Sequence, residues 1–365
     1  MTGFPVYAQK PDVVIVHAAD FSSVASAMMK EYHTGVQLYF ARVNAQGGVQ
    51  GQKLVLRKMD DHFEPDITEA HTKVALSDPQ VMAFIGPRGT QNIMRMLPLA
   101  QKAHTAVVAP AIGSSIVWDP KYTVSFPLRA TYAQEAKVMA NFSTSYGNHV
   151  GLLVTNDAYG KDMHAAVSRF LQEANTQAKM SVVAFDRKNN DFTTQVKAMQ
   201  AANPNTVLMF CSARACGEFL KEWERTRRPG VQASMFITNS ALDLSVLANN
   251  QHAQGVRLDT LVGTQVVPNP RVNFGNGYFE FSQAFTKANT AVSFAALEGW
   301  AAAVGLVDAL RRAPQPLTRE GVVKVLAATN VELGPRFRVD FTHKEPSHAP
   351  PVDIFRIHPL TKRIS

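Results

Sequence analysis

Cysteine is scarce in this chain, because only Cys211 and Cys216 occur among its 365 residues. A small disulfide-stapled fold is therefore excluded, since such scaffolds are short and dense in cysteine. The two cysteines can form a disulfide if the loop between them brings their Cα atoms within about 7 Å; two buried free thiols are the alternative. A zinc site is disfavoured, because no second Cys or His pair lies nearby at ligand spacing.

Long apolar runs and blocks of charge are also missing. No stretch approaches the ~20 apolar residues that a transmembrane helix needs. The formal net charge is +8, but the basic residues are scattered and form nothing longer than pairs such as Arg227-Arg228. A dispersed excess of this kind is typical of a solvated surface that favours anionic ligands. We therefore expect no nucleic-acid partner.

The common enzyme signatures are absent as well. The sequence contains no G-x-S-x-G, H-E-x-x-H or G-x-x-x-x-G-K-[ST] motif. One acidic turn could hold a metal, but a solvated turn between a strand and a helix is the favoured interpretation; it comprises Asp60, Asp61, His62, Glu64 and Asp66. His343, His348 and His358 are too irregularly spaced to indicate a site. The sequence thus predicts no catalytic residue, no metal site and no cofactor.

What the sequence does contain is a regular alternation of short apolar runs with amphipathic helices. This alternation predicts parallel sheets covered by helices on both faces. Two series of runs predict two doubly wound α/β lobes, since 365 residues exceed a single core of about 250–300. The runs cover residues 13–16, 54–56, 81–85 and 106–109, then 150–154, 181–184, 206–210 and 235–238.

Residues 35–61 form the most specific stretch. Apolar side chains from Met28 to Val43 recur every three or four residues and predict a helix. Gly47 and Gly48 then end that helix, and a strand from Leu54 leads into Asp60 and Asp61. The run N-A-x-G-G-x-x-G-x-x-L…D-D resembles the first helix and second strand of the periplasmic solute-binding proteins of the branched-chain amino acid (Leu/Ile/Val-binding) ABC transporter family.

The resemblance extends from about residue 12 to about residue 357 and implies the type I periplasmic binding fold. In that fold two lobes are joined by a three-segment hinge, expected here near 126–130, 263–268 and 338–341. The implied first lobe is 11–128 plus 267–338, and the second is 129–266 plus 339–365. Residues 1–10 then hold a signal-peptide remnant, because Val6-x-Ala8 fits a cleavage site. The implied location is periplasmic, with the signal peptide removed.

Two loops of the expected first lobe match the family's carboxylate-binding segments. Parallel sheets bind ligands beyond the carboxyl ends of their strands, so loops that follow strands are the place to look. Gly89 and Thr90 begin a helix after the third strand, and the N–H groups of a helix start attract anions. Arg88 departs from the amino-acid-binding pattern and adds a cation. After the fourth strand, the resemblance assigns ligand contacts to Ile112, Gly113 and Ser114.

The expected second lobe supplies the opposite wall. Tyr159, in Asn156-Asp-Ala-Tyr-Gly160, matches the family's cleft tyrosine, and Ser212 and Arg214 follow another strand. The family's acid that pairs with the α-ammonium of an amino acid is replaced by Ser240, and Asp243 is the nearest substitute. Since a buried ammonium needs a partner, an amino acid ligand is disfavoured. Tyr159 and Phe210 offer apolar surface for an aromatic or branched aliphatic acid.

The resemblance implies a monomeric, extracytoplasmic solute-binding protein of an ABC importer that closes around a small organic carboxylate. The implied partners are the membrane permease and ATPase components of that transporter. The alternatives are an amino acid-binding protein of the same family and the ligand-sensing domain of a receptor. A repressor is disfavoured, because a strand already begins near Val13. An enzyme is the least favoured reading, since no nucleophile–base pair is recognisable.

Overall fold

A computed structural model describes residues 10–23, 26–174, 177–231, 233, 235–245, 258–358 and 364–365. Residues 1–9 of the expected signal remnant, which was placed at residues 1–10, lie outside the described residues. No helix in the described part of the chain is long and apolar enough to cross a membrane.

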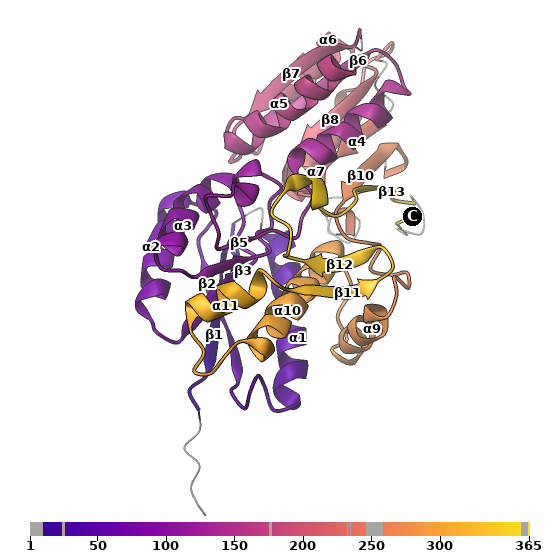
Figure 1. Ribbon diagram of the computed structural model, residues 1–365. Coiled ribbons are helices and arrows are strands. Elements are labelled where there is room, and N and C mark those ends of the chain that lie inside the picture. The colour runs from indigo at the N-terminus through magenta and orange to yellow at the C-terminus, as the bar shows by residue number, and fades with distance from the viewer. Residues whose placement is uncertain are drawn as a thin grey trace, which may run out of the picture.

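The first lobe is built on a parallel sheet with strand order β2-β1-β3-β4-β5 (Figure 1). Its strands are β1 (Val13–Ala19), β2 (Leu54–Asp60), β3 (Val81–Ile85), β4 (Ala106–Val108) and β5 (Ser125–Phe126). The inner strand β1 is buried along its whole length, as a strand covered on both faces must be. The four apolar runs expected in this half of the sequence are confirmed as strands.

The second lobe has a six-stranded sheet with the order β13-β10-β9-β8-β6-β7. Its strands are β6 (His149–Thr155), β7 (Lys179–Phe185), β8 (Thr206–Phe210), β9 (Met235–Thr238), β10 (Leu261–Gln265) and β13 (Asp353–Arg356). All pairings are parallel except that of β13, which pairs antiparallel with β10 and forms one edge of the sheet. The proline-rich C-terminal segment thus supplies the edge strand of this sheet.

Helices cover both sheets, so the doubly wound α/β class is confirmed. In the described residues they are α1 (Ala27–Ala45), α2 (Pro65–Ser77), α3 (Thr90–Lys102), α4 (Tyr132–Thr144), α5 (Ala158–Glu173), α6 (Thr193–Ala202), α7 (Ala213–Thr226), α9 (Gly277–Lys287), α10 (Phe294–Arg312) and α11 (Arg319–Leu326). Short 3₁₀ turns are η1 (Ser115–Trp118), η3 (Leu258–Thr260) and η4 (Pro346–His348). A small hairpin joins β11 (Asn330–Gly334) to β12 (Phe337–Asp340).

The chain passes between the two sheets more than once. It leaves the first sheet after β5, and after β10 it returns to place α10 on α1 and β12 on α10. It then crosses again to pair β13 with β10 (Figure 1). We propose lobe boundaries as the resemblance implies them, with 11–128 and 267–338 in one lobe and 129–266 and 339–365 in the other.

Two glycines set the close approach of α1 to α10, which are distant in sequence. A Cβ on Gly35 would lie 2.0 Å from the carbonyl oxygen of Ala296. A Cβ on Gly299 would lie 2.1 Å from the carbonyl oxygen of Tyr32. Neither contact is tolerable, so only glycine allows these two helix backbones to touch. This packing ties the C-terminal third of the chain to the first lobe.

The two cysteines form a disulfide, with Cα atoms 5.5 Å apart. Cys211 directly follows β8 and Cys216 lies in the first turns of α7. The bond therefore holds the turn between this strand and this helix closed. The alternative of two free thiols is wrong.

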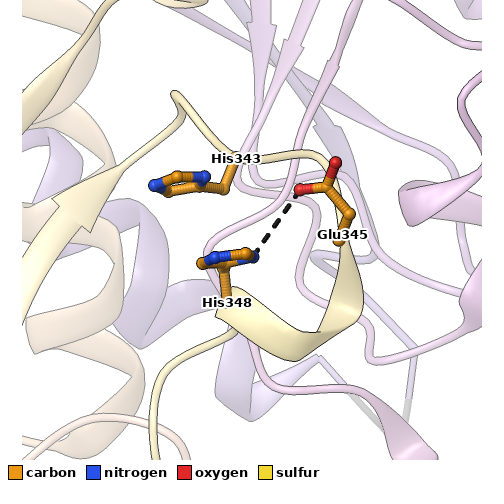
Figure 2. A group of neighbouring side chains, drawn as sticks. All are labelled: His343, Glu345 and His348. Atoms are coloured by element: carbon orange, nitrogen blue, oxygen red, sulfur yellow. Dashed lines mark ion pairs between the residues drawn. The ribbon is translucent and has the colours of Figure 1, made fainter.

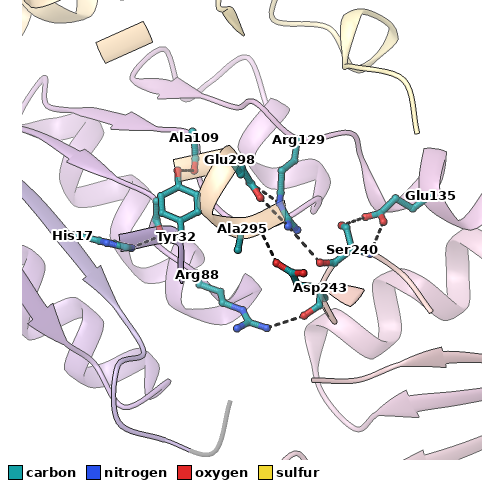
Figure 3. Close-up of polar contacts among 12 residues, drawn as sticks. His17, Tyr32, Arg88, Ala109, Arg129, Glu135, Ser240, Asp243, Ala295 and Glu298 are labelled. Carbon is teal, nitrogen blue, oxygen red and sulfur yellow. Dashed lines mark hydrogen bonds and ion pairs between the residues drawn. The ribbon is translucent and has the colours of Figure 1, made fainter. Parts of the chain in front are cut away.

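A buried polar network lies where the chain first crosses between the sheets (Figure 3). Arg129 and Glu298 are 3% and 1% exposed, and two hydrogen bonds of 2.7 and 3.0 Å join them. Burial alone would lower the pKa of Arg129, but the charge and hydrogen bond of Glu298 and the charge of Glu135 together outweigh it, so the pKa lies above its usual value. The Ser240 backbone carbonyl accepts from Arg129 at 3.5 Å, and Ser240 donates two bonds to Glu135. Helix α10, the first crossing and the end of β9 are thereby linked.

Buried His17 on β1 and half-buried His33 on α1 form a second polar pair, which supports the loop after β3. The Gly86 carbonyl can only accept, so His17 Nε2 donates to it at 3.1 Å. The neutral Nδ1 of His17 then accepts from His33 Nδ1, 3.1 Å away. Burial, followed by the neighbouring ring of His33, lowers the pKa of His17 to about 3, and burial lowers that of His33 to about 4.

We predict that Glu298→Leu destabilises the protein strongly, because it leaves the Arg129 guanidinium buried without its counter-ion. The free energy of unfolding, measured by urea titration, should fall by about 3–5 kcal/mol. The control Asp353→Asn removes an exposed partner of Arg336 and should cost less than about 1 kcal/mol. A loss in Glu298→Leu no larger than in the control would show that the buried pair contributes nothing.

The histidine pair predicts a loss of stability in acid. Both histidines have folded pKa values below the unfolded value of 6.5, so the unfolded chain binds protons first. Their contribution is complete above pH 6.5 and decreases as the pH falls toward 4. Between pH 6.5 and 5.0, fully buried His17 accounts for about 2 kcal/mol, and partly exposed His33 for less. Unfolding of His33→Gln should depend less steeply on pH; an unchanged slope would assign the effect to other groups.

Candidate functional site

A cavity of about 120 Å³ lies between the two lobes. The first lobe contributes Ser23, His62, Phe63, Glu64, Arg88, Gly89, Thr90, Gln91, Ala111 and Ile112 to its wall. The second contributes Tyr132, Thr155, Asp157, Tyr159, Phe185, Arg187, Lys188, Cys211, Ser212, Ala215 and Ala241. Six of the residues expected from the sequence therefore meet in one wall: Arg88, Gly89, Thr90, Ile112, Tyr159 and Ser212. Their roles toward a ligand stay predictions.

The loop from β3 to α3 presents a helix start to this cavity. Gly89 has a φ of 96°, and a Cβ there would lie 2.4 Å from Asn92 Oδ1, so the turn requires glycine. Thr90 begins α3, and its Oγ1 is buried with no hydrogen-bond partner within 3.5 Å among the described residues. The Thr90 side chain interacts with the Tyr132 hydroxyl, and this interaction limits the rise in the pKa of Tyr132. A buried hydroxyl in a cavity wall needs a ligand or water to satisfy it.

Arg88 supplies a positive charge to the same wall. Its side chain is 6% exposed, and its Nη2 donates to the Ala241 carbonyl of the other lobe at 3.2 Å (Figure 3). Burial lowers the pKa of Arg88 and the nearby Asp20 partly offsets this, but a guanidinium remains charged. The end of strand β9, where the family's ammonium-binding acid is expected, is thus contacted by a cation of the protein itself.

Aromatic rings form the apolar part of the wall. Tyr132 and Tyr159 pack edge to face with their centroids 5.1 Å apart. The Tyr159 hydroxyl donates to Asn239 Oδ1 at 2.8 Å. Burial raises the pKa of Tyr132 to about 12 and also raises that of Tyr159 well above its usual value. Both hydroxyls are therefore neutral at physiological pH.

Polar contacts across the cleft hold the lobes together around the cavity. Arg187 pairs with Asp157 of its own lobe at 2.8 Å and donates to Gln91 Oε1 and to the Phe63 carbonyl of the other. Lys188 pairs with Glu64 across the cleft at 2.7 Å. Both acids of the cavity wall thus already have basic partners. The wall contains three basic side chains, Arg88, Arg187 and Lys188, and two acidic ones, Glu64 and Asp157. Without counting His62, its net charge is therefore +1.

Four residues expected from the sequence lie outside the described cavity wall. Ser114 donates to Asp162 of the second lobe at 2.8 Å, and the Gly113 carbonyl accepts from the backbone of Tyr132. Arg214 donates to the Asn189 carbonyl, and Ser240 is bound by Glu135. The structure therefore gives each of them a partner within the protein. Phe210 is fully buried in the core and is likewise absent from that wall.

Sequence reasoning did not assign the other residues of the wall to the site, and the most prominent of them are Phe63, Tyr132, Asp157 and Arg187. Asp157 lies in the same turn as Tyr159, but the sequence analysis gave it no role at the cavity. Its side chain caps α5 by accepting a hydrogen bond from the Gly160 N–H. Tyr132 is the first residue of α4, directly after the chain crosses between lobes. This position beside the crossing is a sequence feature that could have indicated a place in the cavity wall. Nothing in the sequence around Phe63 or Arg187 marks them.

The acidic turn after β2 has a structural role. Asp61 accepts bonds from Thr68, Phe63 N and Asn92, and Asp60 accepts from Phe21 N and His62 N. Burial raises the pKa of Asp61 to about 6. Within the described ranges, the donor atoms of this turn do not form a group able to hold a metal. The expected turn between a strand and a helix is present, but Asp61 is buried in it and not solvated.

Proteins of known structure share the whole architecture. A substrate-binding periplasmic protein from Ralstonia solanacearum is 25% identical, covers 95% of this chain and 98% of its own, and superposes with a TM-score of 0.85. A possible leucine/isoleucine/valine-binding protein from Rhodopirellula baltica is 20% identical, covers 100% and 98%, and has a TM-score of 0.84.

A curated relative and a family model agree with this likeness. The relative, an amino acid binding protein from Pseudomonas aeruginosa, is 20% identical over 301 residues, which are 80% of this chain and 78% of that protein. The family model is described as periplasmic binding protein and matches residues 12–358. Because that match spans nearly the whole chain, and because two α/β lobes enclose one small cavity, this protein belongs to the periplasmic binding protein family.

Proposed function

We propose that this protein is the extracytoplasmic solute-binding component of an ABC importer, and that it binds a small carboxylate lacking an α-amine. The observation that carries the ligand class is the position of Arg88. Its buried guanidinium contacts Ala241, at the strand end where an amino acid binder of this family would hold an acid. A cation there favours a ligand whose only charge is negative.

The carboxylate end of the ligand is proposed to lie at the start of α3. Thr90 Oγ1 is buried without a partner in the described residues, and the first N–H groups of a helix are free to bind an anion. Arg88 lies two residues earlier in the same wall. Gly89 lets the backbone approach the ligand closely, because no Cβ stands between them.

The size and walls of the cavity suit a compact apolar body. A volume of about 120 Å³ is slightly smaller than the ~150 Å³ cavity that accommodates benzene in another protein. Tyr132, Tyr159, Phe63 and Ile112 surround this space. An aromatic or branched aliphatic acid fits such walls better than a sugar, which would leave its hydroxyls without partners.

Binding is proposed to act through closure of the lobes. The contacts of Arg187 with Gln91, of Lys188 with Glu64 and of Ser114 with Asp162 all join one lobe to the other. A ligand that touches both walls adds contacts that only the closed form offers and so shifts the population toward it. No cofactor or catalytic residue is needed for this mechanism. A membrane permease with its ATPase would then recognise the closed form.

An amino acid is the second candidate ligand. The Pseudomonas relative is described as an amino acid binding protein. Asp157 lies in the cavity wall and could accept an ammonium group if Arg187 released it. Asp243, the substitute expected from the sequence, is buried and accepts from the Ala295 and Ser245 amides, so it is not proposed for this role.

We predict that the amine decides affinity. Calorimetry should compare 4-methyl-2-oxopentanoate with leucine, and phenylpyruvate with phenylalanine, because each pair differs only at Cα. The amino acid of each pair should bind at least about 100-fold more weakly, since its ammonium would be buried beside Arg88. Tight binding of leucine with no binding of either oxo acid would reject this ligand class and favour Asp157 as the counter-ion.

We also predict that Thr90→Val weakens binding of the preferred acid by about 1–3 kcal/mol, because it removes a hydrogen bond to a charged group. The exchange keeps the side-chain shape, so the melting temperature of the free protein should hardly change. Thr144→Val, at the far end of α4, is the matched control and should bind normally. Unaltered affinity in a folded Thr90→Val protein would remove Thr90 from the site.

A further inference from the structure

Two histidines and a glutamate converge on the surface after β12. Figure 2 shows His343, Glu345 and His348 facing one another, with the two imidazole rings stacked. One donor atom from each residue lies within 4.8 Å of the other two, and all three side chains are exposed. The rings are 3.9 Å apart with planes inclined by 8°. The three residues lie outside the wall of the interlobe cavity.

The local backbone explains why these side chains meet. Glu345 directly precedes the 3₁₀ turn η4 and His348 is its last residue, and residues three apart in such a turn lie on the same side. The His348 N–H donates to the Glu345 carbonyl at 3.0 Å and closes the turn. The Lys344 N–H donates to Glu345 Oε2 at 3.2 Å and so orients the carboxylate. The convergence therefore comes from a hydrogen-bonded loop.

Lys344 anchors this loop to the body of the protein. Its ammonium donates to the Ser125 carbonyl and lies 3.7 Å from the centre of the Phe126 ring. Burial lowers the pKa of Lys344 to about 8. Because His343 and Glu345 are its direct neighbours in sequence, their backbone is held at β5, beside the first crossing between the lobes.

We propose that His343, Glu345 and His348 form a binding site for a divalent first-row transition metal such as Zn²⁺ or Ni²⁺. Two imidazoles and one carboxylate are donors that these ions prefer, whereas Mg²⁺ and Ca²⁺ prefer oxygen alone. Tetrahedral zinc holds its donors about 3.3 Å apart. The Glu345 Oε2 to His348 Nδ1 distance is already 3.6 Å, and no donor separation has to shrink by more than about 1.5 Å.

The rearrangement needed to bind a metal involves side chains only. The stacked rings have to turn toward each other so that both nitrogen lone pairs aim at one point, and their exposure leaves room for this. Ser347 Oγ, 3.3 Å from His348 Nδ1, has to give up that contact. Water would complete the coordination, since the site is open on its solvent side.

The test is calorimetric titration of the full chain, free of any histidine tag, with Zn²⁺ alone and with Ni²⁺ alone in a non-chelating buffer. We expect one ion per chain. His343→Ala and His348→Ala should each abolish binding at metal concentrations that saturate the unmodified protein, and Glu345→Gln should weaken it. His164→Ala, on helix α5, is the matched control and should bind as the unmodified protein does.

Two results would overturn the proposal. One is the absence of any binding at millimolar Zn²⁺ and Ni²⁺, which would leave the cluster as a surface ion pair of His348 with Glu345. The other is binding that survives in both His343→Ala and His348→Ala, which would place the metal elsewhere. Because the three residues are exposed, these variants should fold normally, and circular dichroism checks that they do.

Discussion

The buried ion pair of Arg129 and Glu298 is the interaction on which the two-lobe arrangement depends. Arg129 lies in the first segment that crosses between the lobes, and Glu298 lies on α10, a helix that the chain reaches only after building most of the second sheet. A charge buried this deeply requires its partner, so the pair fixes α10 against the crossing. Through Ser240 and Glu135 the same network reaches the end of β9 and helix α4.

This network also determines which polar groups reach the cavity wall. Glu135 accepts three hydrogen bonds, from the Ser240 amide, the Ser240 hydroxyl and Thr264. Its carboxylate is therefore fully engaged inside the second lobe, and Ser240 is held away from the cavity. Ala241 is left at the cavity wall, where its carbonyl accepts from Arg88. In an amino acid binder of this family, the end of β9 would carry an acid that pairs with the ligand's ammonium. In this protein the same strand end presents the Ala241 carbonyl to the Arg88 guanidinium.

The agreement between sequence and structure is best where local patterns suffice. The turn at Gly47 and Gly48 has positive φ at both residues, as the sequence predicts for a helix end. The loop at Gly89 and Thr90 lies where the rule for parallel sheets places ligand loops. Arg88 was singled out because it departs from a family pattern. Ser114 was assigned to the ligand on resemblance alone, whereas its hydroxyl binds Asp162.

By itself the sequence determined the alternation of strands and helices, the two-lobe class and the βα loop at the cavity, because these depend on short-range periodicity and glycine conformation. Only the tertiary structure decided which charges meet. Arg187 with Gln91, Lys188 with Glu64 and Arg129 with Glu298 join residues from 96 to 169 positions apart. His343, Glu345 and His348 are close in sequence, but their convergence depends on a turn anchored by Lys344 at β5. Such contacts are set by how distant segments pack, and no local pattern encodes them.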